Sequence, residues 1–202
     1  MGLGLPSVPA MVSVGPLGCD AGGTQRHRGG PEQCADDRLD HCPCSPTRIG
    51  RKKGAHQESI GRSRGGQTTK IHLITNSVGL PIAVTLSSGE ASDYRGYEPL
   101  IEEPGPRPKI MIADKGYDSD AIRGDLATRK VEAVIPMRRN RKTQTPIDSA
   151  IYALRNLIER CFNKLKHSRR LATRYDKTTE SYLGFVLIAS ARLWCRHFVN
   201  MT

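Results

Sequence analysis

The sequence is poor in the residues that mark several common classes of protein. Aromatic residues make up 5% of its 202 residues, and none occurs before Tyr94. The six cysteines are scattered, and Cys34, Cys42 and Cys44, even with His41 among them, do not fit a usual zinc-binding spacing. The cysteine pattern therefore argues against a zinc site.

Long apolar runs are also missing. The longest, from Tyr182 to Ala191, is too short to span a bilayer and is followed by Arg192 and Arg196. The chain does not open on an apolar segment with a cleavage site. These absences predict a cytoplasmic protein that does not associate with membranes.

What the sequence has in excess is positive charge. Its 31 Lys and Arg residues against 20 Asp and Glu give a net charge of +11 and an isoelectric point of about 9.7. Such a balance favours a polyanionic partner, with nucleic acid ahead of a membrane surface. The length suits one domain, or one domain with a tail.

The composition divides the chain near residue 50. Residues 1–50 are rich in Gly and Pro, contain no aromatic residue and show neither helical nor strand periodicity. We expect disorder or poorly packed coil in this segment. The single folded domain is expected to occupy residues 51–202.

Within residues 51–202, the periodicity predicts alternating strands and helices. Strands are expected at 68–75 and 82–86, joined by a turn at Asn76–Gly79, and at 109–113 and 133–136. Helices are expected at 93–103, 119–130, from Thr145 to Lys166, and at 179–199, the last packed on the sheet through Leu183, Val186, Leu187, Ala191 and Trp194. This order predicts an α/β fold with a mixed sheet and helices on both faces.

The stretch from Tyr152 to Lys166 carries the most informative pattern. Tyr152, Arg155, Glu159 and Lys166 are spaced so that a helix would place them on one face. The apolar residues form a separate face; they are Ile151, Leu154, Ile158, Cys161 and Leu165. Glu159 would then lie at the edge of the core between two cations, where a carboxylate can bind a metal. A salt-bridged surface helix explains the same spacing, and the spacing alone leaves both interpretations open.

A second acidic residue follows an apolar run. The segment from Lys109 to Ala113 suits a strand that is buried on both faces, and Asp114 comes directly after it. A carboxylate at that position is fixed and still open to solvent, as a metal ligand must be. An Asp that merely begins a turn is the alternative.

These residues resemble a known family. The spacing Tyr-x2-Arg-x3-Glu-x6-Lys is similar to the hallmark of DDE transposases of the insertion-sequence four/five superfamily. The segments IGRSRGGQTTKIH, IADKGYDSDAIR, AVIPMRRNRK, RNLIERCFNKLK and RRLATRYDKT resemble the insertion-sequence-five family in its usual order. The resemblance runs from about residue 51 to the C-terminus.

The resemblance implies a ribonuclease-H-like fold in which three carboxylates hold two Mg2+ (or Mn2+) ions for DNA strand cleavage and transfer. It implies that Asp114 and Glu159 are catalytic residues and metal ligands, and that Tyr152, Arg155 and Lys166 position the DNA. It also implies a homo-oligomer on transposon ends and target DNA, associated with the bacterial nucleoid.

Two basic runs are expected beside this site. Arg138, Arg139, Arg141 and Lys142 follow the strand at 133–136, and we expect them to bind the DNA backbone. The earlier run suits phosphate contacts or a solvated loop; it comprises Arg51, Lys52, Lys53, Arg62, Arg64 and Lys70. Asp93 is expected to be a helix N-cap rather than a catalytic residue.

The first catalytic Asp of the family has no counterpart at its expected place. Codons for the stretch from Arg38 to Pro46 can, in a shifted reading frame, spell Asp-Trp-Thr-Ile-Val-Arg-Ala-His, which is the motif that the family carries there. Our hypothesis is that the chain is out of frame up to about Gly50, so that the first strand is missing or disrupted. The in-frame candidates for the third ligand are Asp36, Asp37 and Asp40.

This departure leaves two functions open. One is a transposase that is weak or inactive as this chain alone. The other is a non-catalytic DNA-binding or inhibitory transposase fragment, which keeps the basic runs and needs no third carboxylate. A structural basic protein, such as a ribosomal one, is disfavoured by the Tyr-Arg-Glu-Lys spacing and by the context of Asp114.

Overall fold

A computed structural model describes residues 11–13, 41–43, 59–63, 66–105, 108–142, 144 and 146–200. The disorder expected for most of residues 1–50 lies outside these ranges, as do Asp36, Asp37, Asp40, Arg51, Lys52, Lys53 and Arg64. Among the described helices, none has the length and hydrophobicity that a bilayer crossing requires.

The central element is an antiparallel hairpin, as predicted. Strand β4 (Gly66–Thr75) pairs with β5 (Pro81–Ser88), and Asn76 closes the turn because its Oδ1 accepts hydrogen bonds from the backbone N–H groups of Val78 (3.0 Å) and Leu80 (2.9 Å). The short strand β3 (Gly61–Ser63) folds back on the start of β4.

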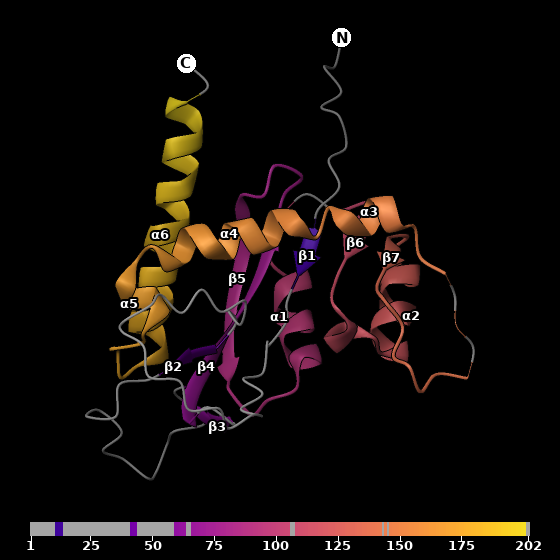
Figure 1. The fold of residues 1–202 in the computed structure, drawn as a ribbon, viewed down its shortest axis with the longest axis horizontal. Helices are drawn as coiled ribbons and strands as arrows, with labels where there is room; N and C mark the ends of the chain where they lie inside the picture. The colour runs from indigo at the N-terminus through magenta and orange to yellow at the C-terminus, as the bar shows by residue number, and fades with distance from the viewer. Residues whose placement is uncertain are drawn as a thin grey trace, which may run out of the picture.

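Two further strands that pair with β4 come from residues 1–50, where the sequence shows no periodicity. They are β1 (Met11–Ser13) and β2 (His41–Pro43), both antiparallel to β4. The sequence did not predict them because three residues are too few to show an alternation. Strand β1 lies between β4 and the neighbouring strand β6 (Figure 1).

The second sheet is a β–α–β unit. Strand β6 (Ile110–Ile112) pairs in parallel with β7 (Glu132–Val134), and helix α2 (Asp120–Thr128) connects them. The predicted strands and helix are present here, each slightly shorter than expected. Asp114 therefore comes directly after the end of β6, and the two residues before it, Ile112 and Ala113, are buried, as predicted.

Helices cover both faces of the sheet region. The alternation along β4 sends Ile74 to one side, where it packs with α1 (Tyr97–Ile101) and α2, and sends Leu73 to the other. There it meets α4 (Asn156–Lys166), α5 (Arg169–Ala172) and α6 (Thr179–Val199). Figure 1 shows α6 on one side of the hairpin, α1 and α2 on the other, and α4 crossing between them. The chain is thus a mixed α/β domain.

The helix expected to run unbroken to Lys166 is two helices, so this prediction is wrong. Helix α3 (Ser149–Ala153) begins after Asp148, whose Oδ1 accepts from the N–H groups of Ala150 and Ile151. Between α3 and α4 the backbone N–H groups bond to carbonyls three residues earlier, from Leu154 onward, so the chain passes through a tighter turn. The two helices stay nearly in line (Figure 1).

Helix α6 has the predicted extent but not the predicted contact face. Its buried residues are Tyr182, Val186, Ala189, Ser190 and Leu193. Leu187, expected in the interface, has 51% of its surface exposed. The helix turns about 100° per residue, so the stripe that begins at Tyr182 passes through Val186 and leaves Leu187 on the solvent side.

Gly96 makes a close approach that allows a test of packing. A Cβ at this position would lie 2.3 Å from Nδ1 of the buried His72 ring. The backbone at Gly96 has an ordinary φ of −79°, so the obstacle is steric alone. We expect Gly96→Ala to lower the free energy of unfolding by about 1–3 kcal/mol.

Gly124 provides the matched control, since a Cβ there would meet nothing within 4 Å. Gly124→Ala should stabilise the exposed part of α2 by about 1 kcal/mol. Urea denaturation of both variants measures the difference, and similar effects from the two would show that the contact with His72 is unimportant.

Candidate active site

Asp114 is held at the point where β6 ends. Its backbone is still extended (φ −77°, ψ 166°), and a short 3₁₀ turn, Lys115–Tyr117, begins directly after it. Its Oδ1 accepts a hydrogen bond from the N–H of Lys115 at 2.6 Å, and its side chain is partly buried. Asp114 therefore begins a turn, as the simpler alternative proposed, and it is also a fixed carboxylate at a strand end.

Glu159 lies on the solvent side of α4. Its side chain is 48% exposed, and its Oε1 accepts a hydrogen bond from Nη2 of Arg155, four residues earlier. The guanidinium of Arg155 also lies 5.9 Å from the centre of the Tyr152 ring. Lys166 follows in the last turn of α4 and is partly buried. The spaced row thus includes the salt bridge that its spacing predicts.

Tyr152 connects the helical row to the strand end. Its ring packs at the cluster formed by Ile112 of β6 and Val134 of β7. Burial raises the pKa of its phenol; Arg155 opposes this effect, and the carboxylates of Asp114 and Glu159 both add to it. Tyr152 therefore contacts the strand that ends before Asp114 and, through Arg155, is connected to the carboxylate of Glu159.

A third carboxylate near Asp114 belongs to Asp93, but it is already paired. Nζ of the buried Lys70 donates to Oδ1 of Asp93 at 2.9 Å and to the carbonyl oxygen of Ala91. Burial raises the pKa of Asp93, Lys70 opposes the rise, and the charge of Asp114 adds to it. In the described part of the chain, no three His, Cys, Asp or Glu side chains are grouped so that they could hold a metal ion.

Two expectations are corrected by this pair. Asp93 is not a helix N-cap: Ser92 occupies the cap position of the 3₁₀ turn Asp93–Gly96, and the carboxylate of Asp93 turns to Lys70 instead. Lys70 is not a solvated or phosphate-binding residue, because it lies inside the sheet and its ammonium group is bound to Asp93.

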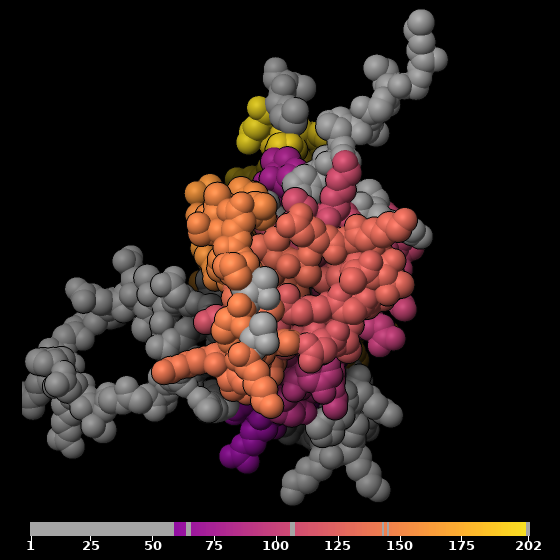
Figure 2. Space-filling model, turned by 90° about the vertical axis from the view of Figure 1, so that its right-hand side faces the viewer, coloured from indigo at the N-terminus to yellow at the C-terminus, as the bar shows by residue number. Residues whose placement is uncertain are grey.

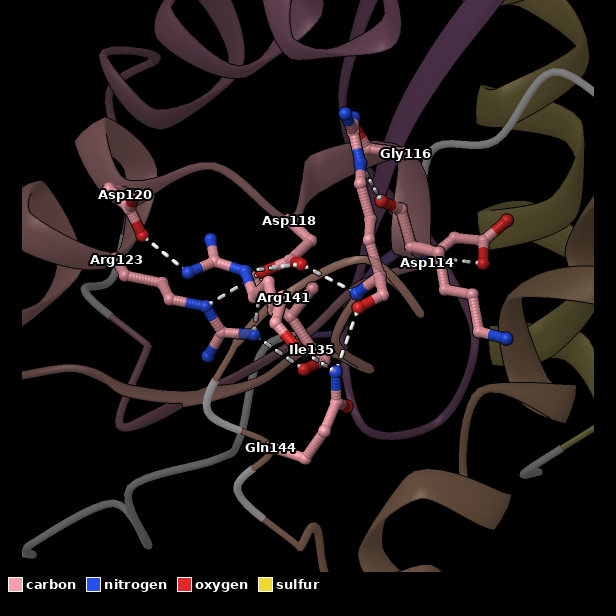
Figure 3. Close-up of polar contacts among 10 residues, drawn as sticks. Asp114, Gly116, Asp118, Asp120, Arg123, Ile135, Arg141 and Gln144 are labelled. Carbon is pink, nitrogen blue, oxygen red and sulfur yellow. Dashed lines mark hydrogen bonds and ion pairs between the residues drawn. The ribbon is translucent and has the colours of Figure 1, made fainter.

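The second basic run follows β7 and divides into two kinds of residue. Arg138, Arg139 and Lys142 are exposed. Arg141 instead donates from Nε to Asp118 and from Nη1 to Asp120 (Figure 3). Figure 2 shows the side of the molecule that α2 and the chain from β7 to α4 form together.

Asp118 is a buried carboxylate whose contacts the sequence did not reveal. It accepts hydrogen bonds from Arg123, Arg138 and Arg141. The sequence signal was the second acidic residue of IADKGYDSDAIR, four positions after Asp114. Its partners come from other segments, so the spacing alone did not reveal its role.

Comparison with known proteins adds an independent finding. The family model described as "Transposase DDE domain" matches residues 44–194. A Brucella ovis protein named "Putative transposase for insertion sequence element IS6501" is 35% identical over 130 residues, which are 64% of this chain and 99% of that protein. No solved structure matches the chain.

A second relative comes from Burkholderia cepacia and is named "Putative transposase for insertion sequence element IS402". It is 32% identical over 135 residues, which are 62% of this chain and 61% of that protein. The family model covers more than half of the chain, and this chain matches nearly the whole of the Brucella protein. The chain therefore belongs to the DDE transposases of the insertion-sequence four/five type.

Proposed function

We propose that this chain is the catalytic part of a transposase, with Asp114 and Glu159 as the metal-binding residues for DNA strand cleavage and transfer. One observation carries the proposal. Tyr152 packs against β6, at whose end Asp114 lies, and Arg155 contacts both the Tyr152 ring and the carboxylate of Glu159 on α4, so one chain of contacts connects the two carboxylates. The alternative is that the Arg155–Glu159 salt bridge only stabilises α4, and this alternative gives no reason for Asp114 to lie at the neighbouring strand end.

The chemistry of the donor set fits Mg2+ or Mn2+. Both ions prefer oxygen ligands, and Mg2+ is usually held by one or two carboxylates together with the oxygens of a substrate phosphate. Asp114 and Glu159 supply two carboxylates, and Asp114 is partly open to solvent. When bound, the metal ion would lower the barrier to attack on a phosphodiester by stabilising negative charge.

The surrounding residues have distinct tasks in this proposal. Arg155 keeps the carboxylate of Glu159 in place and offers a cation beside it. Tyr152 is anchored in the core by its ring, so its hydroxyl is a fixed contact for the DNA. Lys166 and the exposed Arg138, Arg139 and Lys142 supply positive charge for neighbouring phosphates.

The fold is proposed to be ribonuclease-H-like, with its first strand altered. In that fold the first strand is central to the sheet and carries the first catalytic Asp. Here β1 lies between β4 and β6, but Met11–Ser13 contains no carboxylate. This supports our hypothesis that the first strand is altered and that the catalytic domain in residues 51–202 is partial. The third ligand is then missing or misplaced, and Asp36, Asp37 and Asp40 stay its in-frame candidates.

Binding of Mn2+ tests the proposed metal ligands directly. In the presence of duplex DNA, Asp114→Asn and Glu159→Gln should each weaken Mn2+ binding by about 100-fold, since they remove a ligand oxygen. Electron paramagnetic resonance of free Mn2+ measures the affinity. Asp125→Asn, which changes a carboxylate bound to Tyr97 and Arg129, is the matched control and should bind as the wild type does. Equal affinity in all four proteins would reject the site.

Within the described residues, no third carboxylate joins Asp114 and Glu159 in a metal-binding group, and this favours a second candidate function. A chain that binds DNA without cutting it needs the basic residues and not the third ligand. We expect the purified chain alone to show little or no Mg2+-dependent cleavage of DNA that carries transposon ends. Cleavage that is detectable in the wild type and lost in Asp114→Ala would contradict this expectation and establish the catalytic function.

A further inference from the structure

Asp118 is a buried carboxylate at the centre of a polar network. Its side chain has 0% exposure. It accepts hydrogen bonds from Nε of Arg123 (3.0 Å) and from Nε of Arg141 (2.7 Å), both labelled in Figure 3. It also accepts one from the backbone N–H of Arg138 (2.7 Å). Burial alone would raise the pKa of Asp118, but the hydrogen bonds from Arg141, Arg138 and Arg123 together outweigh it, so the pKa is lowered. The group is therefore a charged carboxylate held by three donors.

These contacts join the chain between Asp114 and α2 to the segment after β7, which is 20 or more residues away in the sequence. Asp118 follows the turn after Asp114, Arg123 lies in α2, and Arg138 and Arg141 lie in the segment after β7. Nη2 of Arg123 also donates to the carbonyl oxygen of Ile135 at 2.7 Å, which fixes the chain just after β7. The position of the second basic run relative to Asp114 therefore depends on Asp118.

Gln144 supports the same segment from outside. Its Nε2 donates to the carbonyl oxygens of Arg138 (2.9 Å) and Arg141 (3.2 Å). Arg141 is held a second time by Oδ1 of Asp120 at 2.6 Å. With two carboxylates on its guanidinium, Arg141 is suited to holding the segment rather than to contacting DNA.

Arg138 is the residue that this arrangement places beside Asp114. Its Nε and Nη2 lie 3.4 Å and 3.3 Å from the carbonyl oxygens of Lys115 and Gly116, the two residues after Asp114. These hydrogen bonds are long and the side chain is exposed, so a phosphate oxygen would be a better acceptor. The guanidinium also borders an open polar cleft of about 550 Å³, lined by Lys70, Asp93, Gly116, Asp118 and Arg141 among others.

We propose that Asp118 is a positioning residue that holds Arg138 beside Asp114, so that Arg138 binds a DNA phosphate at the site of cleavage. The inference rests on the proposed function for the identity of the ligand. It goes further by assigning the phosphate contact to Arg138, the positioning to Asp118, and a holding role to Arg141.

The salt dependence of DNA binding tests this proposal without metal or catalysis. Fluorescence anisotropy of a short labelled duplex of mixed sequence, in EDTA and over a range of KCl concentrations, gives the slope of log affinity against log salt. Arg138→Ala should reduce the magnitude of that negative slope by about 0.9, the value for one lost phosphate contact. Asp118→Asn should lower it by nearly the same amount, and the double variant should lower it no further.

Asp125→Asn is matched for the change in charge, because it also removes one negative charge from an Arg-bound carboxylate on the same part of the chain. It should keep the wild-type slope. If Asp118→Asn does not fold, Gln144→Ala tests the positioning of Arg138 instead, since Gln144 is exposed and neutral and its loss should not unfold the chain. In the Gln144→Ala background, Arg138→Ala should have a smaller effect on affinity than in the wild type.

Three results would overturn the inference. They are a wild-type slope in Asp118→Asn, additive effects of Asp118→Asn and Arg138→Ala, and no binding of the duplex by the wild-type chain. Each of these results concerns DNA binding without metal, whereas the Mn2+ experiment measures the metal affinity that Asp114 and Glu159 provide. The positioning role can therefore fail while the metal site stands, and the reverse also holds.

Discussion

Replacing Arg174 with alanine is expected to lower the free energy of unfolding by about 3–5 kcal/mol, because it removes a large buried side chain and leaves buried hydrogen-bond acceptors without their donor. Arg174 has 1% of its surface exposed and its guanidinium is fully engaged. Nη1 donates to Oγ1 of Thr69 in β4 at 2.6 Å, and Nε donates to the carbonyl oxygen of Asp176 at 3.0 Å. Its Cζ lies 5.1 Å from the centre of the Tyr182 ring in α6.

The size of this effect follows from what Arg174 joins. It links the central strand β4 to the loop before α6, and without it the carbonyl oxygens in that loop would face a cavity. Arg174→Lys should recover only part of the loss, because an ammonium group does not reproduce the planar fork of a guanidinium.

Urea denaturation of Arg174→Ala and Arg169→Ala separates burial from charge. Arg169 lies five residues earlier on the exposed side of α5 and loses the same charge. Its replacement should change the stability by no more than about 0.5 kcal/mol. Equal losses in the two variants would mean that net charge, and not the buried network, determines the effect.

The elements that the sequence predicted are those defined by contacts close along the chain. The β4–β5 hairpin, the β6–α2–β7 unit and the bounds of α6 follow from local periodicity and turn residues. The break between α3 and α4 was not visible, because Ile151, Leu154 and Ile158 keep helical spacing across a 3₁₀ turn. The spacing of apolar residues does not distinguish hydrogen bonds to the third preceding residue from those to the fourth.

In the candidate site, too, the sequence predicted the local patterns and not the contacts between distant segments. Asp114 and the row from Tyr152 to Glu159 were found because a strand end and a helix repeat are local patterns. Lys70–Asp93 and Asp118–Arg141 were not found, since each pair joins residues 23 positions apart in different segments. Charged residues in such pairs look in the sequence like any other surface charge. Only the packing shows that Lys70 and Arg141 are held in ion pairs with Asp93 and Asp118, whereas the side chain of Arg138 is exposed.

His72 lies in β4 and connects the hairpin to the loop after Asp114. Its ring is fully buried, with Nδ1 2.9 Å from the hydroxyl of Tyr117 and Nε2 2.6 Å from Oγ of Ser87. Burial, and then the charge of Lys70, lowers the pKa of His72 from 6.5 to about 3. The imidazole is therefore neutral in the folded chain, with one ring nitrogen donating and the other accepting.

This neutral histidine predicts that the domain loses stability in mild acid. Below pH 6.5 the unfolded chain binds a proton at His72 while the folded chain does not, and this difference persists down to about pH 3. The contribution of His72 to the free energy of unfolding should therefore fall by about 1.4 kcal/mol for each pH unit in that window. Asp93, whose pKa is raised, acts in the opposite direction, because its folded form takes up a proton more readily.

Comparison with His72→Gln isolates this contribution from that of Asp93 and the other carboxylates. The variant should be less stable than the wild type at pH 7, where it loses part of the contact with Tyr117. Urea denaturation between pH 4.5 and pH 6 should then give a slope against pH that is smaller by nearly one proton. His167→Gln, which replaces an exposed histidine, is the matched control for the substitution itself. Parallel slopes for the wild type and His72→Gln would show that the His72 ring is protonated in the folded chain.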